Sequence, residues 1–102
     1  MELKIYWTDF SKNELQNIFL YYKNIASLKV ARKIISGITN TVLILKSQPR
    51  IGQKEELLKD RVGEFRYLIN KNYKIIYQVK TESIEILDVF DTRQNPIKIE
   101  ER

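Results

Sequence analysis

Residues 65–79 read FRYLINKNYKIIYQV, and this stretch predicts two adjacent antiparallel strands. Apolar side chains recur at alternate positions over 65–69, and the alternation resumes over 73–79. Between them, residues 70–72 (Asn-Lys-Asn) are typical of a tight turn. Because successive strand residues point to opposite faces, we expect the odd-numbered residues of both strands to share one face.

Two more strands are predicted on either side of this pair in the chain. Residues 84–90, IEILDVF, follow a second tight turn and predict the last strand of a meander. Their consecutive apolar residues Ile86 and Leu87 indicate a bulge or burial on both faces. Residues 3–7, LKIYW, also alternate and predict a first strand, whose pairing partner the sequence leaves open.

Two amphipathic helices are predicted between the first strand and the meander. Apolar residues recur at helical spacing over 10–25 and again over 30–45. Suitable N-cap residues precede both helices: Thr8 or Asp9 before the first and Ser27 before the second. Pro49 is expected to end the second helix, because proline cannot continue the helical hydrogen bonds. The short link between the helices predicts an antiparallel hairpin.

The element order β-α-α-β-β-β predicts a two-layer α+β fold, with the helical hairpin packed on one face of a twisted antiparallel sheet. We expect a single domain over residues 1–102, a loop or short helical turn over 53–64, and a frayed tail at 97–102. Because successive strand residues point to opposite faces, the odd-numbered strand residues are predicted to lie under the hairpin. They are Leu3, Ile5, Trp7, Phe65, Tyr67, Ile69, Tyr73, Ile75, Tyr77 and Val79.

The opposite sheet face is predicted to be open, basic and partly apolar. The residues expected on it are Lys4, Tyr6, Arg66, Leu68, Lys74, Ile76 and Gln78. If Arg66 and Lys74 lie on adjacent strands of this face, their side chains converge on one phosphate, and Tyr6 adds a stacking surface. A solvated sheet face that carries Lys and Arg only for solubility is the alternative interpretation.

Composition excludes several kinds of chemistry. The chain has no Cys and no His, which removes disulfides, zinc-thiolate sites, iron–sulfur clusters, thiol nucleophiles and imidazole bases. Neither a glycine-rich phosphate loop nor a carboxylate cluster with metal spacing occurs, so we expect no metal and no cofactor.

The charge and hydropathy patterns indicate partners and location. A net charge of +5 favours acidic or polyanionic partners. The longest strongly apolar stretch, residues 42–45, is far too short to cross a bilayer, and no signal peptide is visible. We therefore expect a cytoplasmic protein that does not associate with membranes.

Several motifs, taken in order, carry a family resemblance over nearly the whole chain. They are Tyr6-Trp7-Thr8, the helical hairpin, Pro49-Arg50-Ile51-Gly52, Phe65-Arg66-Tyr67-Leu68, NYKIIYQV at 72–79 and IEILDVFDTRQNP at 84–96. With this order and spacing, the chain resembles the RelE/ParE family, the toxins of type II toxin–antitoxin pairs.

The resemblance implies a toxin that a cognate antitoxin wraps and blocks, in a toxin–antitoxin hetero-oligomer. RelE-like members cleave messenger RNA in the ribosomal decoding site, and ParE-like members poison DNA gyrase. The basic open face favours ribosome-dependent, metal-independent mRNA cleavage, with ribosome and mRNA as partners. The alternatives are a gyrase inhibitor and a degenerate antitoxin-binding module without toxicity.

The same resemblance implies candidate site residues. Arg66, Lys74 and Arg93 match the basic side chains that neutralise the scissile phosphate, and Asp91 is the candidate proton acceptor. Further RNA-binding candidates are Lys4, Tyr6, Lys59, Arg61 and Gln78. Two positions depart from the RNA-cleaving relatives: Lys74 stands where Arg is frequent, and Asp91 stands near a frequent His. An RNase mechanism would therefore need a raised pKa at Asp91, or a strong contribution from the ribosome.

Overall fold

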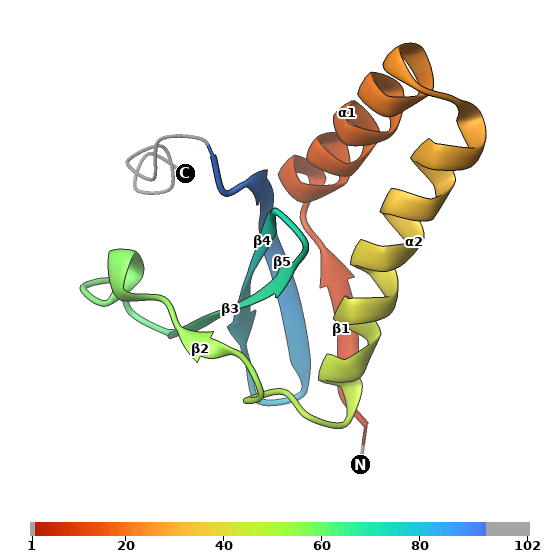
Figure 1. Ribbon diagram of the computed structural model, residues 1–102. Coiled ribbons are helices and arrows are strands. Elements are labelled where there is room, and N and C mark those ends of the chain that lie inside the picture. Colours follow the sequence, from red (N-terminus) through yellow and green to blue (C-terminus); the bar gives the residue numbers. More distant parts are fainter. Residues whose placement is uncertain (1, 94–102) are drawn as a thin grey trace.

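A mixed sheet and a helical hairpin form two layers in the computed structural model, which describes residues 2–93 (Figure 1). Within this part of the chain the strand order is β1-β5-β4-β3-β2. The elements are β1 (Lys4–Trp7), α1 (Asp9–Ile25), α2 (Leu28–Leu43), η1 (Ile44–Lys46), β2 (Gln53–Lys54), η2 (Glu56–Leu58), β3 (Glu64–Asn70), β4 (Tyr73–Val79) and β5 (Ser83–Asp91). The predicted α+β class is confirmed, and the tail predicted at 97–102 lies outside the described residues.

The sheet is mixed rather than wholly antiparallel. β1 pairs in parallel with β5, with Lys4 opposite Ser83 and Trp7 opposite Ile86. Parallel neighbours need a long connection between them. Here the helical hairpin and the first strands of the meander supply it, because they lie between β1 and β5 in the chain. The short edge strand β2, within the segment expected to be a loop or helical turn, adds to β3.

The helix starts confirm the predicted caps. The Thr8 hydroxyl accepts a hydrogen bond from the Ser11 backbone N–H at 3.0 Å, and the Ser27 hydroxyl accepts one from Val30 at 3.1 Å. α2 ends at Leu43 and continues as the 3-10 helix η1, before the chain reaches Pro49. No helix within residues 2–93 is long and apolar enough to span a membrane.

The main core lies between the hairpin and the sheet. Ile38, Val42 and Leu45 are buried against residues of three strands that face the hairpin: Ile5, Trp7, Tyr73, Ile75, Tyr77, Val79, Ile84, Ile86 and Val89. A register shift opposite Ile76 and Tyr77 leaves Leu87 without a paired residue on β4, while Ile86 packs in this core and Leu87 packs on the other side of the sheet. The bulge predicted from these two apolar residues is confirmed.

The faces predicted for β3 are wrong, and a turn of two residues is the reason. Asn70 pairs directly with Tyr73, so that only Lys71 and Asn72 form the turn, with Lys71 at a φ of 54°. The sequence pattern predicts a turn of three residues, 70–72. Because side chains alternate with a period of two, a shift of one residue moves every β3 side chain to the opposite face.

This shift separates residues that were expected to converge. Arg66 lies opposite Tyr77 and Leu68 opposite Ile75, on the hairpin side. Phe65, Tyr67 and Ile69 lie on the other face, which also carries Lys74. The predicted shared face of Arg66 and Lys74 is therefore incorrect.

The face away from the hairpin is partly covered. η2 places Leu58 against Ile76 and Phe90, and all three side chains are buried. Phe65, Tyr67 and Leu87 pack around them and form a second, smaller core. The basic open face expected from the sequence is thus interrupted by an apolar cluster.

The link between η1 and β2 is held by one tyrosine. The hydroxyl of Tyr77, which is fully buried, donates to the Pro49 carbonyl at 2.8 Å and accepts from the Gly52 backbone N–H at 3.1 Å. A Cβ on Gly52 would come within 2.5 Å of this hydroxyl and of the Tyr67 carbonyl, so the site requires glycine. Burial raises the pKa of Tyr77, which keeps the hydroxyl protonated at neutral pH.

We predict that Tyr77→Phe lowers the free energy of unfolding by about 1–3 kcal/mol, because a buried N–H and a carbonyl lose their partner. Urea unfolding followed by circular dichroism measures the effect. Tyr6→Phe, which removes a hydroxyl from an exposed ring, is the control and is expected to change stability by less than about 0.5 kcal/mol. Equal stability of the two variants would contradict this role of Tyr77.

Candidate functional site

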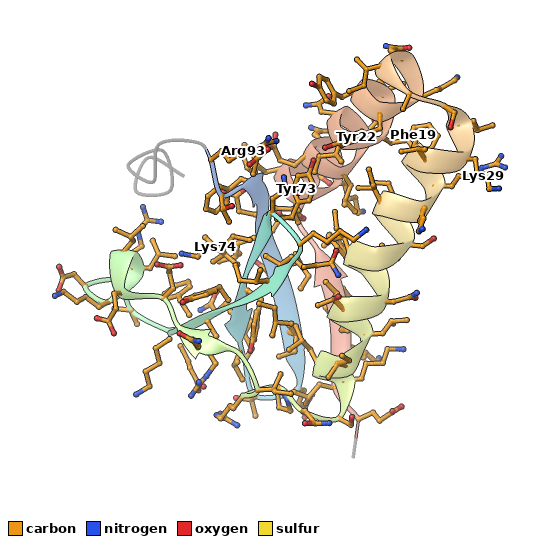
Figure 2. The ribbon with its side chains drawn as sticks, viewed as in Figure 1. Phe19, Tyr22, Lys29, Tyr73, Lys74 and Arg93 are labelled. Atoms are coloured by element: carbon orange, nitrogen blue, oxygen red, sulfur yellow. The ribbon has the colours of Figure 1, made fainter. Side chains whose placement is uncertain are left out.

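The four predicted catalytic residues do not form one cluster. Lys74 points from β4 to the face that η2 covers, whereas Arg66 and Asp91 lie on the hairpin side of the sheet, opposite Tyr77 and Tyr73. Arg93 follows the end of β5 and contacts Asp91. Figure 2 shows Arg93 close to Tyr73, and Arg93, Tyr73 and Tyr22 line one cavity.

Lys74 is occupied by an internal ion pair. Its ammonium lies 2.5 Å from Oε2 of Glu55, whose side chain is 2% exposed, against 17% for Lys74. The same ammonium stands 4.2 Å from the centre of the Tyr67 ring, a cation–π contact. Oε1 of Glu55 accepts from the Leu57 backbone N–H at 3.1 Å and caps η2.

Glu55 is a residue that the sequence analysis missed. No periodicity in residues 53–64 marks it, because its importance comes from the strand register that brings Lys74 beside it. One sequence feature points to Glu55: it stands two residues before Leu57, a position from which a carboxylate can cap a short helical turn.

Arg66 stabilises the edge of the sheet. Its guanidinium donates to the Gly52 carbonyl and to Oε2 of Glu64, both at 2.8 Å. Arg50 binds the same carboxylate from the outside, with its Nε 2.9 Å from Oε2. Hydrogen bonding by Arg66, then by Arg50, holds the pKa of Glu64 below its ordinary value.

Asp91 is held as a carboxylate by Arg93. The Arg93 side chain and backbone N–H both donate to it, at 2.8 and 2.9 Å to Oδ1. The Arg93 hydrogen bond keeps the pKa of Asp91 well below its usual range, so Asp91 binds a proton only weakly at neutral pH. The raised pKa that a general base at Asp91 would need is not found.

A cavity of about 380 Å³ lies beside Asp91, between α1 and the end of β5. Tyr22 and Tyr73 line it, and their hydroxyls are 3.2 Å apart. Burial, with the Tyr22 hydrogen bond, raises the pKa of Tyr73, so this hydroxyl also stays protonated at neutral pH. The cavity therefore offers two protonated tyrosine hydroxyls beside the Asp91 carboxylate.

The RNA-binding candidates fall in two separate places. Lys4, Tyr6 and Gln78 lie on the sheet face away from the hairpin, where Tyr6 and Gln78 both stand opposite Glu85. Lys59 and Arg61 are exposed in the segment after η2. A cavity of about 480 Å³ near that segment has mixed charge, because Arg50, Lys54, Lys59 and Arg66 share its lining with Glu55, Glu56 and Glu64.

Within residues 2–93, no group of three or more Asp, Glu, Cys or His side chains is placed to hold a metal ion. Each of the four catalytic candidates has a partner inside the protein: Lys74 pairs with Glu55, Arg66 with Glu64 and the Gly52 carbonyl, and Asp91 with Arg93. Arg66 and Lys74 therefore contribute to the protein's own fold.

A comparison with protein families gives one match that covers most of the chain. The profile described as "ParE toxin of type II toxin-antitoxin system, parDE" matches residues 5–96. The chain belongs to this ParE toxin family. Membership implies an antitoxin partner for this ParE-family protein. A search of curated proteins found no significant match.

Two solved structures share the fold of this ParE-family chain. One is described as the chromosomal ParDE TA system from P. aeruginosa, with a TM-score of 0.73 and 21% identity, over 88% of this chain and 96% of that one. The other is the YoeB dimer from Staphylococcus aureus, with a TM-score of 0.55 and 18% identity, over 86% and 94% of the two chains. At these identities the likeness shows the fold alone.

We predict that Arg66→Met raises the pKa of Glu64 toward its ordinary value and destabilises the protein. A lowered carboxyl pKa stabilises the fold at neutral pH, and this contribution is lost as the pH falls through the folded-state pKa. The unfolding free energy of the variant should therefore depend less on pH below about 5 than that of the original chain. NMR titration of the Glu64 carboxyl and urea unfolding at several pH values test this.

Lys12→Met, which removes an exposed charge far from Glu64 in the chain, is the control for this prediction. An unchanged Glu64 pKa and unchanged stability in Arg66→Met would show that the edge contacts are unimportant in solution.

We also predict that Glu55→Gln and Lys74→Met each cost about 2–4 kcal/mol of stability, because each leaves a buried charge without its partner. The double variant should lose less than the sum of the single losses, since both charges are then gone. Lys80→Met and Glu85→Gln, at an exposed ion pair, form the matched cycle and should couple by less than about 1 kcal/mol. Additive losses at Glu55 and Lys74 would contradict the pairing.

Proposed function

We propose that this ParE-family toxin arrests growth by binding and inhibiting DNA gyrase, without cleaving RNA. The family profile supports the gyrase-directed branch, because it describes the ParE toxin of parDE systems over residues 5–96. Because the proposed target, DNA gyrase, acts in the cytoplasm, we expect the toxin there, in a hetero-oligomer with its antitoxin.

The observation that carries the proposal is the separation of the candidate catalytic residues. RNA cleavage through a 2′-hydroxyl needs a base within hydrogen-bond reach of the proton and cationic groups at the same phosphate. Here Lys74 is bound to Glu55 on one face, and Arg66 is bound to Gly52 and Glu64 on the other. Asp91 is neutralised by Arg93 and is a weak base.

Ribosome-dependent mRNA cleavage is the alternative, and the Glu55–Lys74 pair is the observation that favours it. A carboxylate and an ammonium stand together beside Tyr67, so the pair unites an acid and a base at one point. Cleavage there would require the ribosome to open the ion pair. A third reading is a degenerate antitoxin-binding module without toxicity.

Controlled expression in a bacterial host tests the proposal, with growth, plasmid supercoiling and transcript ends followed together. We expect growth arrest with loss of supercoiling and DNA breaks, and no new transcript ends inside codons. The Glu55→Gln/Lys74→Met variant serves as the comparison, because gyrase inhibition does not require this pair. It should retain growth arrest in proportion to the folded protein present, measured by circular dichroism.

Each other outcome selects another function. Transcripts cut inside codons, with cutting lost in the double variant, would establish the mRNA-cleaving alternative. A folded protein that causes no growth defect would establish the module without toxicity. In both cases the gyrase proposal fails.

A further inference from the structure

The cavity of about 380 Å³ between α1 and the end of β5 is lined on one side by a single face of the helix. The helical residues stand at positions i, i+3, i+4, i+7 and i+8, a spacing that places side chains next to one another along a helix. They are Glu14, Asn17, Ile18, Tyr21 and Tyr22. Ile18 and Tyr22 pack against the main core, whereas Asn17 and Tyr21 are exposed. This face of α1 therefore combines an apolar base with polar groups near solvent.

Three tyrosines line the cavity: Tyr21, Tyr22 and Tyr73. Figure 2 shows Tyr22 and Tyr73 next to one another, and the Tyr73 hydroxyl donates to that of Tyr22 at 3.2 Å. The rings of Tyr21 and Tyr22 meet edge to face, with 5.1 Å between their centres and 87° between their planes. Aromatic ring faces attract cations, and a tyrosine oxygen accepts hydrogen bonds from N–H groups. The tyrosines therefore suit a ligand that is positively charged and carries N–H groups.

The lining of this cavity is acidic, although the chain as a whole has a net charge of +5. The charged side chains are two carboxylates, Glu14 and Asp91, and one guanidinium, Arg93. Arg93 binds Asp91 through its side chain and its backbone N–H, so these two charges neutralise each other. Glu14 takes part in none of the ion pairs found within residues 2–93. Its carboxylate is therefore available to a cation from outside.

We propose that this cavity binds a guanidinium group carried on a short apolar chain. The Glu14 carboxylate would accept two parallel hydrogen bonds from the guanidinium, and a tyrosine ring would stack against its plane. The apolar chain of the ligand would lie against Ile18. The inference goes beyond gyrase inhibition, because it assigns a ligand to a cavity that gyrase inhibition does not require.

The lining favours a guanidinium over other ligands. An anion would meet the Glu14 carboxylate, and the Arg93 guanidinium already binds Asp91. A metal ion needs several oxygen ligands, and residues 2–93 contain no group of three or more Asp, Glu, Cys or His side chains that could hold one. An alkylammonium is more strongly hydrated than a guanidinium and has no plane to stack on a tyrosine.

The experiment is an NMR titration of the full ¹⁵N-labelled chain with butylguanidinium and with butylurea, a neutral ligand of the same shape. We expect butylguanidinium to shift the amide resonances of residues 14–22, 73 and 91. Butylurea should bind at least about tenfold more weakly, because it loses the charge that pairs with Glu14. Butylammonium should bind at least about threefold more weakly than butylguanidinium, because it lacks the planar fork.

A free small molecule and an arginine side chain of another protein carry the same guanidinium group. The blocked peptide acetyl-Ala-Arg-Ala-amide distinguishes these two sources in the same titration. Peptide binding at least as tight as that of butylguanidinium would support the cavity as a site for an arginine side chain. Weaker binding of the peptide, with butylguanidinium bound, would support a free ligand.

Single substitutions test the residues of the cavity. Glu14→Gln keeps the shape of the side chain and should weaken the binding of butylguanidinium at least about tenfold. Tyr21→Leu removes an exposed ring and should weaken it about threefold. Glu82→Gln, at an exposed carboxylate in the turn between β4 and β5, is the matched control and should bind within about twofold of the original chain. Circular dichroism should show the same fold for all three variants, because none of these side chains lies in either core.

Several results would overturn the inference. They are no shifts at residues 14–22 with butylguanidinium, equal binding of butylguanidinium and butylurea, and equal weakening by Glu14→Gln and Glu82→Gln. Shifts centred on acidic residues outside the cavity would likewise show that the cation binds only by surface charge. None of these results bears on supercoiling, so the gyrase proposal stands or fails separately.

Discussion

The pairing of Asn70 with Tyr73 is the constraint on which the rest of this structure depends. It leaves two residues in the β3–β4 turn and sets which side of the sheet every β3 side chain occupies. Arg66 is thereby placed toward Tyr77 and Gly52, where it stabilises the edge of the sheet. Tyr67 and Phe65 are placed toward Leu58, where they complete the second core, and the Tyr67 ring contacts the Lys74 ammonium. A three-residue turn would exchange these roles.

In the candidate site, ion pairs and hydrogen bonds within the protein occupy the charged side chains, which leaves these side chains less able to act on a substrate. A lysine or arginine stabilises a phosphate only if it is free to turn toward it, and an aspartate accepts a proton only if its pKa is near the working pH. Lys74, Arg66 and Asp91 each have a close partner of opposite charge. Exposed lysines such as Lys12, Lys29 and Lys59 have no ion pair within residues 2–93, and they are spread over several elements.

Local patterns predicted most of the fold because their physical causes are local. The caps at Thr8 and Ser27 depend on a hydroxyl three residues from a backbone N–H, and the bulge at Leu87 follows from two consecutive apolar residues in a strand. The parallel pairing of β1 and the covering of the second face by η2 were not predictable in this way. Both depend on where a distant segment of chain packs. The same limit explains why Glu55 was missed and why Arg66 and Lys74 were expected to converge.

The sequence by itself determined the order of elements, the two-layer α+β class, the toxin family and the stretch without acidic residues at 15–54, because periodicity, capping and composition are properties of the chain. Only the tertiary structure decided which charged residues meet. A single residue in the length of one turn reverses a strand's faces while leaving its alternating pattern unchanged, so the pattern cannot report the choice. The packing of both faces of the sheet selects one register, and with it the partners of Arg66 and Lys74.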